Sequence, residues 1–402
     1  MKSQVAVLTG GGDRPYALGL AFSLAEHGVA LDFIGSDFLE SPELSSHRLV
    51  RVLNLRGDIS PDAPPVRKVL RVVRYYLRLL RYAASTDVRL FHILWNNKFE
   101  TFDRTLLMLY YRLFGRRVVM TVHNVNIRKR DGNDTFLNRL TLRAQYHSCA
   151  HLFVHTEQMK RELEQGFAVS PAKISVIPFG INATVPDTNL TPAEARRKLG
   201  LGAADQVVLF YGNIAPYKGL EFLVAAAERL KDRLPRLRLV IAGRPKGAES
   251  YWASVSSMLA ASGVGQRAIQ RAEYVPDAET EVYFKAADVV ALPYTHVFQS
   301  GVLFLAYNFG LPVIASDVAS MREDIVEGKT GFVCRPADPD DLAQKIDAFF
   351  ASTLYATLSS QRGLIREFAH ERYSWSKVAT ITKSVYAAVG GSTGREASAT
   401  SS

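Results

Sequence analysis

Short apolar runs alternate with longer segments of helical periodicity along most of the chain. In the first half these runs are Val5–Thr9, Ala30–Ile34, Leu90–Leu94, Val118–Val122, Leu152–His155 and Ile174–Ile177. In the second half they are Val207–Tyr211, Leu237–Ala242, Ala268–Tyr274, Val289–Leu292, Val313–Ala315 and Gly331–Cys334. The runs are rich in Val and Ile and bounded by Gly or Pro, which is typical of parallel strands covered by helices on both faces. The pattern predicts an α/β protein with doubly wound sheets.

The length of 402 residues favours two domains over one small core. A polar stretch at residues 182–190 precedes a capping box, Thr191-Pro192-Ala193-Glu194, that opens a helix. We predict two Rossmann-like domains facing a central cleft, at residues 1–182 and 183–372. A helix at 373–389, able to cross back to the first domain, and a disordered tail at 390–402 follow. Ligands of such sheets bind at the carboxyl ends of the strands, so the loops there are site candidates.

Composition indicates a soluble globular protein, with 48% apolar and 22% charged residues. Two distant cysteines, Cys149 and Cys334, cannot form a disulfide framework and are expected to be buried thiols. The first apolar run is too short for a signal peptide, and no run approaches the roughly 18 apolar residues of a membrane span. We therefore expect a cytoplasmic protein.

The net charge of +10 is unevenly distributed. Residues 1–186 contain 25 Lys and Arg against 16 Asp and Glu, whereas residues 187–402 contain 24 against 23. The basic half is expected to face an anionic partner such as lipid headgroups, nucleic acid or a diphosphate, although an excess of charge can also serve solubility alone. No nucleic-acid-binding motif is present, so we expect no nucleic-acid partner.

A basic helix is predicted at Val66–Ser85. At about 100° per residue, five arginines form one narrow stripe, and they are Arg67, Arg71, Arg74, Arg78 and Arg81. A helix at a lipid surface would place these arginines at headgroup phosphates and the flanking tyrosines in the interface. A domain helix with one solvated stripe explains the pattern equally well. A second basic and aromatic patch follows at Tyr110–Arg117.

Two loops of the first half are site candidates. The sequence Gly10-Gly11-Gly12-Asp13-Arg14-Pro15 follows the first strand but does not match the spacing of a dinucleotide fingerprint, which disfavours a nicotinamide enzyme. His123 follows the strand Val118–Val122 and is placed to act as a base or to bind a hydroxyl or phosphate; a purely structural role is the alternative. His92 lies within an apolar strand and is expected in the core.

Three loops of the second half suit a phosphorylated ligand. Lys218 precedes a helix start in the loop Gly212–Gly219, and Arg244 follows the strand Leu237–Ala242. Both suit a diphosphate, but a solvated surface cation is the alternative for each. The polar loop Thr295–Ser300 runs into a helix at Gly301, whose free N–H groups attract anions.

The chain contains no sequence motif for a metal centre or a Walker-type phosphate loop, because the patterns H-E-x-x-H, C-x-x-C and G-x-x-x-x-G-K-[ST] are missing. Its G-x-S-x-G spacing, at residues 390–394, falls in the predicted disordered tail and gives no support for a nucleophilic serine. We therefore expect no metal and no cofactor.

Several motifs together resemble glycosyltransferase family 4, whose members have the GT-B fold, from the Gly11-Gly12 loop to the Trp375 helix. They are G-N-I-x-P-Y-K-G at Gly212–Gly219, L-V-I-A-G at Leu239–Gly243, A-A-D-V-V-x-L-P-Y at Ala286–Tyr294, Q-S-G-V-L at Gln299–Leu303, G-L-P-V-I-A-S-D at Gly310–Asp317, T-V-H-N at Thr121–Asn124 and V-I-P-F-G-I at Val176–Ile181. The resemblance implies transfer of a sugar from a nucleotide donor, with retention of anomeric configuration and without an obligatory metal.

The resemblance also implies roles for individual residues. The donor would bind the second domain and the acceptor, a lipid-linked or polysaccharide glycan, the first. The donor-binding residues would be Gly212, Asn213, Lys218, Arg244, Tyr274, Val275, Gln299, Ser300, Gly301 and Val302. Lys218 would hold the diphosphate, and the amides of Ser300–Val302 would cap its distal phosphate. His123 would contact the transferred sugar, Gly11-Gly12 would border the diphosphate and acceptor, and Tyr274-Val275 would lie near the base.

The sequence departs from the family pattern at four positions. Many members carry two glutamates eight positions apart where this chain has Val297 and Leu305, and an arginine is often found where it has Asn213 and Ala215. Activity is still expected, through a front-face displacement in which the leaving phosphate accepts the proton of the incoming hydroxyl. The alternatives are a catalytically degenerate sugar-nucleotide-binding subunit and a sugar-nucleotide epimerase of the same fold.

Overall fold

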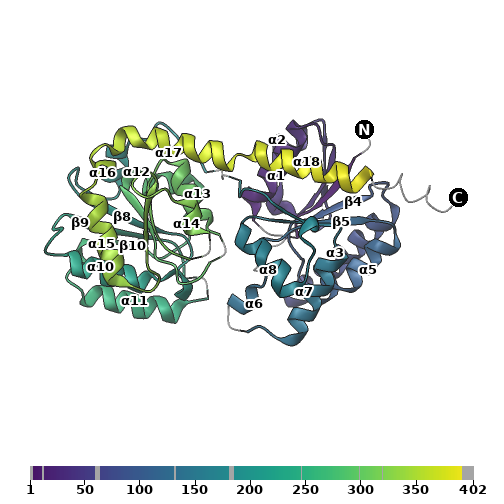
Figure 1. The fold of residues 1–402 in the computed structure, drawn as a ribbon, viewed down its shortest axis with the longest axis horizontal. Coiled ribbons are helices and arrows are strands. Elements are labelled where there is room, and N and C mark those ends of the chain that lie inside the picture. The colour runs from purple at the N-terminus through teal and green to yellow at the C-terminus, as the bar shows by residue number, and fades with distance from the viewer. Residues whose placement is uncertain are drawn as a thin grey trace. The chain divides into compact units, whose positions relative to one another are not determined.

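The computed structural model describes residues 3–10, 13–58, 64–130, 133–180, 185–245, 247–297, 299–318 and 320–391. The chain divides into two compact units, each with its own sheet (Figure 1). Unit 1 comprises Met1–Gly180 and Tyr373–Ser402, and unit 2 comprises Ile181–Arg372. The division falls two residues before the end of the predicted N-terminal domain, and the last helix belongs to unit 1.

Unit 1 is built on a parallel sheet of seven strands in the order β3-β2-β1-β4-β5-β6-β7. The strands are β1 (Val5–Leu8), β2 (Leu31–Gly35), β3 (Val50–Asn54), β4 (Leu90–Ile93), β5 (Arg117–Thr121), β6 (His151–Val154) and β7 (Ile174–Val176). The six strands predicted for this half are confirmed. The edge strand β3 was not predicted, because its half-exposed sequence contains Arg51 and Asn54 and forms no continuous apolar run.

Helices cover both faces of this sheet. They are α1 (Arg14–Glu26), α2 (Pro42–Ser46), α3 (Pro65–Ser85), α4 (Glu100–Arg104), α5 (Leu106–Leu113), α6 (Ile127–Arg130), α7 (Phe136–Ser148), α8 (Glu157–Phe167) and α18 (Trp375–Gly391), with 3-10 turns η1 (Asp37–Leu39) and η2 (Pro171–Lys173). Figure 1 shows α1, α2 and α18 on one side of the sheet and α3, α5, α7 and α8 on the other.

The last helix, α18, packs onto unit 1 through its first residue, Trp375. A Cβ atom on Gly19 or Gly180 would lie 2.3 Å from the indole of Trp375, so both glycines are needed for the indole to fit. Val378 and Ala379 of α18 join the same buried core. The predicted tail begins at residue 390, but α18 continues to Gly391. Residues 392–402 lie outside the described residues.

Unit 2 is built on a parallel sheet of six strands in the order β10-β9-β8-β11-β12-β13. They are β8 (Gln206–Tyr211), β9 (Leu237–Ala242), β10 (Ala268–Arg271), β11 (Val289–Leu292), β12 (Val313–Ser316) and β13 (Gly331–Cys334), so all six predicted strands are present. The prediction that the third of them reaches Tyr274 is wrong. Strand β10 pairs only with β9 and ends where Arg271 meets the last residue of that partner, Ala242.

The helices of unit 2 lie on both faces of its sheet (Figure 1). They are α9 (Pro192–Lys198), α10 (Leu220–Leu230), α11 (Glu249–Ala261), α12 (Asp277–Ala286), α13 (Gly301–Asn308), α14 (Met321–Asp324), α15 (Pro339–Phe350), α16 (Thr353–Ala356) and α17 (Leu358–Tyr373), with 3-10 turns η3 (Pro216–Lys218) and η4 (Gly265–Arg267). The Thr191–Glu194 capping box forms as predicted, and Asp338 caps α15. Figure 1 shows α10, α11 and α15 on one face of the sheet and α12 and α13 on the other.

The strand order of each sheet reverses once relative to the sequence. The reversal lies between β1 and β4 in unit 1 and between β8 and β11 in unit 2. Connections that leave such a pair of strands cross to opposite faces, which opens a crevice at their carboxyl ends. Among the candidate residues, Lys218 follows β8 and His123 follows β5, the strand beside β4, so both lie at or next to these two positions.

Candidate functional site

Lys218 ends the 3-10 turn η3, in the loop after β8, and its side chain is buried with 7% exposure. Its Nζ atom lies 5.4 Å from the ring centroid of Tyr294. No carboxylate among the described residues pairs with this ammonium. Burial lowers the pKa of Lys218, because removal from water disfavours the charged form. The alternative of a solvated surface cation is therefore wrong for Lys218.

Glycines allow three loops to pack tightly around this lysine. A Cβ on Gly243, whose φ is +147°, would lie 1.9 Å from the carbonyl oxygen of Gly212. A Cβ on Gly219, whose φ is +63°, would lie 2.1 Å from the carbonyl oxygen of Pro293. Neither position has room for a side chain, and both backbone conformations favour glycine. The loops after β8, β9 and β11 are thereby brought together at the switch point of unit 2.

The start of α13 lies in the same place. Ser300 caps this helix, and its Oγ accepts a hydrogen bond from the N–H of Leu303. A Cβ at Gly212 would lie 3.0 Å from Nζ of Lys218 and 3.4 Å from Cγ2 of Val302, so the lysine and the first turn of α13 flank one glycine. Gly301 is exposed and has open space around it. First-turn N–H groups have no intrahelical partner and carry the positive end of the helix dipole, so an anion is favoured here.

The other donor-site candidates of unit 2 differ in exposure and in their contacts. Oε1 of Gln299, just before the cap, is buried and has no hydrogen-bond partner within the part of the chain that the structure describes. Arg244 is exposed, and its guanidinium carbon lies 5.5 Å from the ring centroid of Tyr274, which is 59% exposed. Val275 is buried and Asn213 is exposed. Arg244 and Tyr274 thus present a stacked cation and ring at the surface, beside the ends of β9 and β10.

His123 of unit 1 follows β5 and is held between aromatic rings. Its ring stacks on Trp95 with centroids 4.2 Å apart and planes 5° apart, and it meets Tyr16 edge-on at 4.6 Å. Burial lowers its pKa well below the usual value, and the neighbouring His155 adds to this effect. The imidazole is therefore neutral at physiological pH.

The hydrogen bonds of His155 determine which nitrogen of His123 is protonated. Nδ1 of His155 lies 3.3 Å from the carbonyl oxygen of Ile177, which can only accept, so this Nδ1 carries the proton. Burial lowers the pKa of His155 to about 4, so its Nε2 is an unprotonated acceptor. That Nε2 lies 3.1 Å from Nδ1 of His123, which must donate. Nε2 of His123 is left as a buried acceptor without a partner among the described residues.

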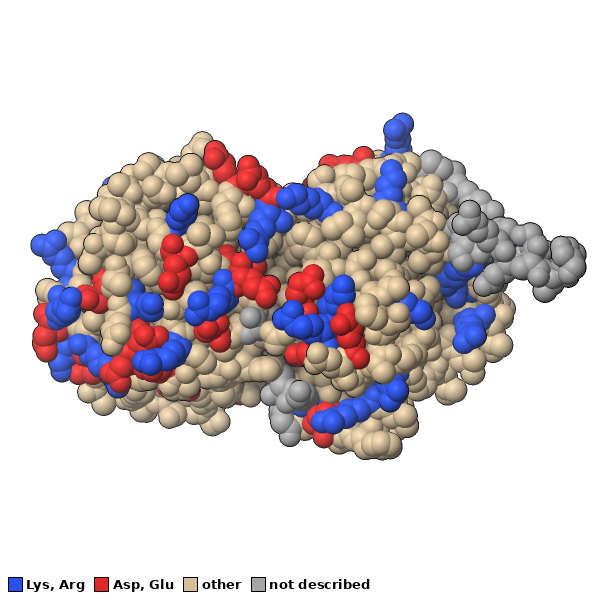
Figure 2. Space-filling view, viewed as in Figure 1, with Lys and Arg blue, Asp and Glu red and all other residues tan. Residues whose placement is uncertain are grey.

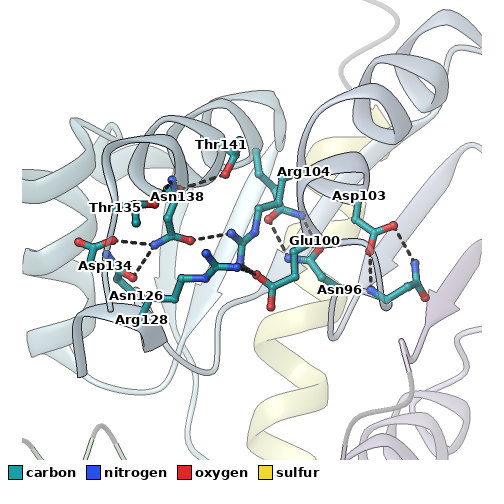
Figure 3. Close-up of polar contacts among 12 residues, drawn as sticks. Asn96, Glu100, Asp103, Arg104, Asn126, Arg128, Asp134, Thr135, Asn138 and Thr141 are labelled. Carbon is teal, nitrogen blue, oxygen red and sulfur yellow. Dashed lines mark hydrogen bonds and ion pairs between the residues drawn. The ribbon is translucent and has the colours of Figure 1, made fainter. Parts of the chain in front are cut away.

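Beside His123, unit 1 contains a cavity of about 180 Å³ lined by both polar and apolar residues of β5, α4, α6, α7 and the loops after β4 and β5. Figure 3 shows a continuous chain of polar contacts along its wall. Arg104 is buried, pairs with Glu100 at 2.8 Å and donates to Oδ1 of Asn138 at 2.8 Å. Nδ2 of Asn138 in turn donates to Oδ1 of Asn126 at 3.0 Å and to Asp134 at 2.7 Å. This wall offers amides, a carboxylate and a guanidinium to a hydroxyl-rich ligand.

Sequence reasoning did not find this cavity. Trp95 and Asn96 come two and three residues after the end of β4, at the same edge of the sheet as His123, and that position was an available signal. Arg104 and Asn138 gave no such signal. They lie on helices that only the folded chain brings together, and lone polar residues in helices are common.

The remaining predicted residues are placed as follows. Gly11 and Gly12 lie outside the described residues. His92 is in the core as predicted, with Nδ1 2.6 Å from the hydroxyl of Tyr386, and burial lowers its pKa to about 3. Cys149 and Cys334 are buried free thiols, as predicted.

The arginine stripe of the basic helix is largely exposed on α3. Arg67, Arg74, Arg78 and Arg81 are exposed, whereas Arg71 is half-buried and pairs with Asp58 at 3.1 Å. The expectation that tyrosines flank the stripe at a lipid interface is wrong for Tyr75 and Tyr76. Both are buried, and they donate to Asn97 and Asp103, respectively.

Two family models cover most of the chain. The model described as "Glycosyltransferase Family 4" matches residues 10–185, and that described as "Glycosyl transferases group 1" matches residues 205–352. The chain belongs to glycosyltransferase family 4. The resemblance drawn from the sequence motifs is confirmed, and the protein is a glycosyltransferase.

Among its relatives are proteins named D-inositol 3-phosphate glycosyltransferase. The one from Corynebacterium efficiens is 26% identical over 411 residues, covering 95% of this chain and 92% of the relative. The one from Kineococcus radiotolerans is 32% identical over 185 residues, covering 45% and 42%.

Solved structures share the fold. Sucrose-phosphate synthase from Thermosynechococcus elongatus is 20% identical, covers 97% of this chain and 100% of its own, and has a TM-score of 0.75. Anabaena HepE in complex with UDP and glucose is 16% identical, covers 96% and 100%, and has a TM-score of 0.72. The two parallel sheets are therefore those of the GT-B fold, as predicted.

Proposed function

We propose that this glycosyltransferase moves a hexosyl group from a nucleoside-diphosphate sugar bound in unit 2 to a hydroxyl of an acceptor bound in unit 1, with retention of anomeric configuration. The single observation that carries the proposal is Lys218. A buried ammonium that no carboxylate among the described residues neutralises is costly, and it lies beside the open first turn of α13. A diphosphate supplies the missing negative charge to both groups.

The same groups account for the chemistry. As the bond between the sugar carbon and the diphosphate oxygen breaks, negative charge grows on the leaving group. Lys218 and the amides of Gly301 and Val302 stabilise that charge where it develops. The acceptor oxygen forms its bond to the same face of the sugar, and its proton passes to a phosphate oxygen. The proposal requires no metal ion and no protein nucleophile. Tyr274 and Arg244 offer a stacking surface for the nucleobase.

The acceptor is proposed to be a lipid-linked or polysaccharide glycan held in the cavity beside His123. The neutral Nε2 of His123 accepts a hydrogen bond, which suits a sugar hydroxyl and not a phosphate oxygen. Arg104, Asn126 and Asn138 line the same cavity. Polysaccharide biosynthesis at the inner face of the cell membrane is consistent with such an acceptor. The names of the relatives add D-inositol 3-phosphate as a further acceptor to test.

A donor panel tests the proposal. Nucleoside-diphosphate sugars of several bases and hexoses are incubated with the protein, with glycan, lipid-linked and inositol-phosphate acceptors, and in the presence and absence of EDTA. We expect transfer from one donor class, unchanged by EDTA, with an unchanged anomeric configuration by NMR. Hydrolysis or epimerisation of every donor without transfer, or loss of transfer with EDTA, contradicts the proposal.

Nucleotide binding is predicted to weaken at alkaline pH. Burial lowers the pKa of Lys218 in the free protein, and the negative charges of a bound diphosphate raise it again. Between these two pKa values binding takes up a proton, so the affinity falls by up to about tenfold per pH unit as pH rises. Titration calorimetry at increasing pH, in buffers of different ionisation enthalpy, measures both effects. In Lys218→Arg the guanidinium stays charged, so the proton uptake should disappear; equal uptake in both proteins contradicts the assignment.

A further inference from the structure

One side of unit 1 carries most of the exposed apolar side chains in the described part of the chain. Of eighteen exposed large hydrophobic residues there, fourteen lie between Val66 and Leu140. They project from α3, α5, α7 and the segments around them, and Figure 1 shows these helices on one side of the sheet. Single exposed apolar residues are ordinary, but a concentration of this kind marks an interaction surface.

Helix α3 divides into three stripes. Tyr75, Tyr76, Leu79 and Ala83 are buried against the domain. At about 100° per residue, exposed Val73 and Leu77 lie between this buried stripe and the arginines. The basic helix therefore exposes both an apolar and a cationic stripe. A domain helix whose outer side is only solvated would be expected to expose polar residues there.

The apolar stripe continues onto the neighbouring helices. Helix α5 lies beside α3, since the hydroxyl of Tyr110 donates to the carbonyl oxygen of Leu80 at 3.1 Å. It exposes Leu109 and Leu113, the latter by 74%. Helix α7 packs against α4 and α5 and exposes Phe136 by 83%. We call the exposed side of α3, α5 and the start of α7 the helical face.

The positive charge of the first half is concentrated in the same segment. Residues 65–117, which include α3 and α5, contain 12 Lys and Arg against 3 Asp and Glu. This excess of nine equals the whole excess of residues 1–186, which contain 25 against 16. Figure 2 shows mixed acidic and basic side chains over unit 2 but mainly basic ones around α5. The helical face is thus apolar and strongly basic together.

We propose that unit 1 binds the surface of an anionic lipid bilayer through the helical face. Leucine, valine and phenylalanine side chains enter the boundary of the acyl chains, and the arginines of α3 bind headgroup phosphates. None of the described helices is long and apolar enough to span a membrane, so the binding is peripheral. A second copy of this chain is the less suitable occupant, because a symmetric contact would bring arginine stripes of like charge together.

The helical face lies next to the proposed acceptor cavity. Helix α7 contributes Asn138 and Leu142 to the cavity wall, while Phe136 of the same helix is exposed. This arrangement favours an acceptor that is itself anchored in the bilayer, an inference that rests on the proposed function. The docking proposal does not depend on that step, because membrane binding is measured without donor or acceptor.

Vesicle flotation with the full chain tests the docking. The protein is mixed with vesicles of phosphatidylcholine alone or of phosphatidylcholine with about 40% phosphatidylglycerol, which gives the vesicles a strong negative surface charge. Three double variants are compared with the unchanged protein: Leu109→Ser with Leu113→Ser, Arg74→Gln with Arg78→Gln, and a control in unit 2, Met258→Ser with Leu364→Ser. All six side chains are exposed, so melting temperatures should stay unchanged and show that each variant folds.

We expect binding to the anionic vesicles only. The leucine variant should lose about tenfold or more in apparent affinity for the vesicles, because two apolar side chains that enter the bilayer are replaced by serine. The arginine variant should lose roughly fivefold in affinity per arginine. The unit 2 control should bind as the unchanged protein does. Absence of vesicle binding, or full binding by the leucine variant, overturns the proposal. A second result would also overturn it: the unchanged protein sediments as a dimer and does not bind vesicles, and the leucine variant sediments as a monomer. The helical face would then join two copies of the chain.

Discussion

Replacing Lys218 with Met is expected to lower kcat/KM by about 10²–10³-fold without destabilising the protein. The ammonium is buried, no carboxylate of the described chain pairs with it, and burial lowers its pKa. Its charge therefore costs folding free energy that only a bound anion recovers. Met has a similar length and no charge, so the melting temperature of the free variant should equal or exceed that of the unchanged protein.

The variant should also lose the rise in melting temperature that a nucleoside diphosphate gives the unchanged protein, because a ligand stabilises only the form it binds. Lys329→Met is the matched control, since Lys329 is exposed in the same unit. Its activity and its response to nucleotide should be unchanged. A Lys218→Met variant that retains both activity and the nucleotide response would show that the lysine does not hold the diphosphate.

Replacing His123 with Ala is expected to lower kcat/KM by about 10²-fold, because a hydrogen bond to a reacting or positioned hydroxyl is lost. His155→Phe should cost less, since it leaves the His123 ring in place but removes the acceptor that fixes its tautomer. Nitrogen-15 NMR of the histidines separates the two effects. In the unchanged protein Nδ1 of His123 should be protonated and Nε2 not, and in His155→Phe both tautomers should be seen.

A purely structural role for His123 gives a different pattern. Both variants would then lower the melting temperature and the activity in parallel, and the tautomer would not change with activity. His370→Ala serves as the control for a histidine on the surface of unit 2.

The sequence predicted the strands well because parallel strands buried on both faces leave continuous apolar runs. The strand that was not predicted, β3, is a half-exposed edge strand. Its Arg51 pairs with Asp32 of β2, so its sequence contains polar residues and no continuous apolar run. Helix starts at Thr191 and Asp338 were also predictable, since their caps are local hydrogen bonds between residues close in sequence.

The burial and the contacts of the site residues were less predictable from the sequence. Lys218 is buried because Gly243 and Gly219 let two distant loops close on the β8 loop, and no local pattern reports such a contact. Tyr75 and Tyr76 were misplaced because a helical repeat shows which residues share a face but not which face the domain covers. The cavity wall of Arg104 and Asn138 likewise joins residues 34 positions apart.

The central claim is that the donor diphosphate lies against Lys218 and the first turn of α13. A crystal structure of the protein with the nucleoside diphosphate that most raises its melting temperature tests it directly. We predict phosphate oxygens at hydrogen-bond distance from Nζ of Lys218 and from the amides of Gly301 and Val302. A nucleotide bound with its phosphates away from Lys218, or a sulfate-free crystal in which this position stays empty at saturating nucleotide, would contradict the account.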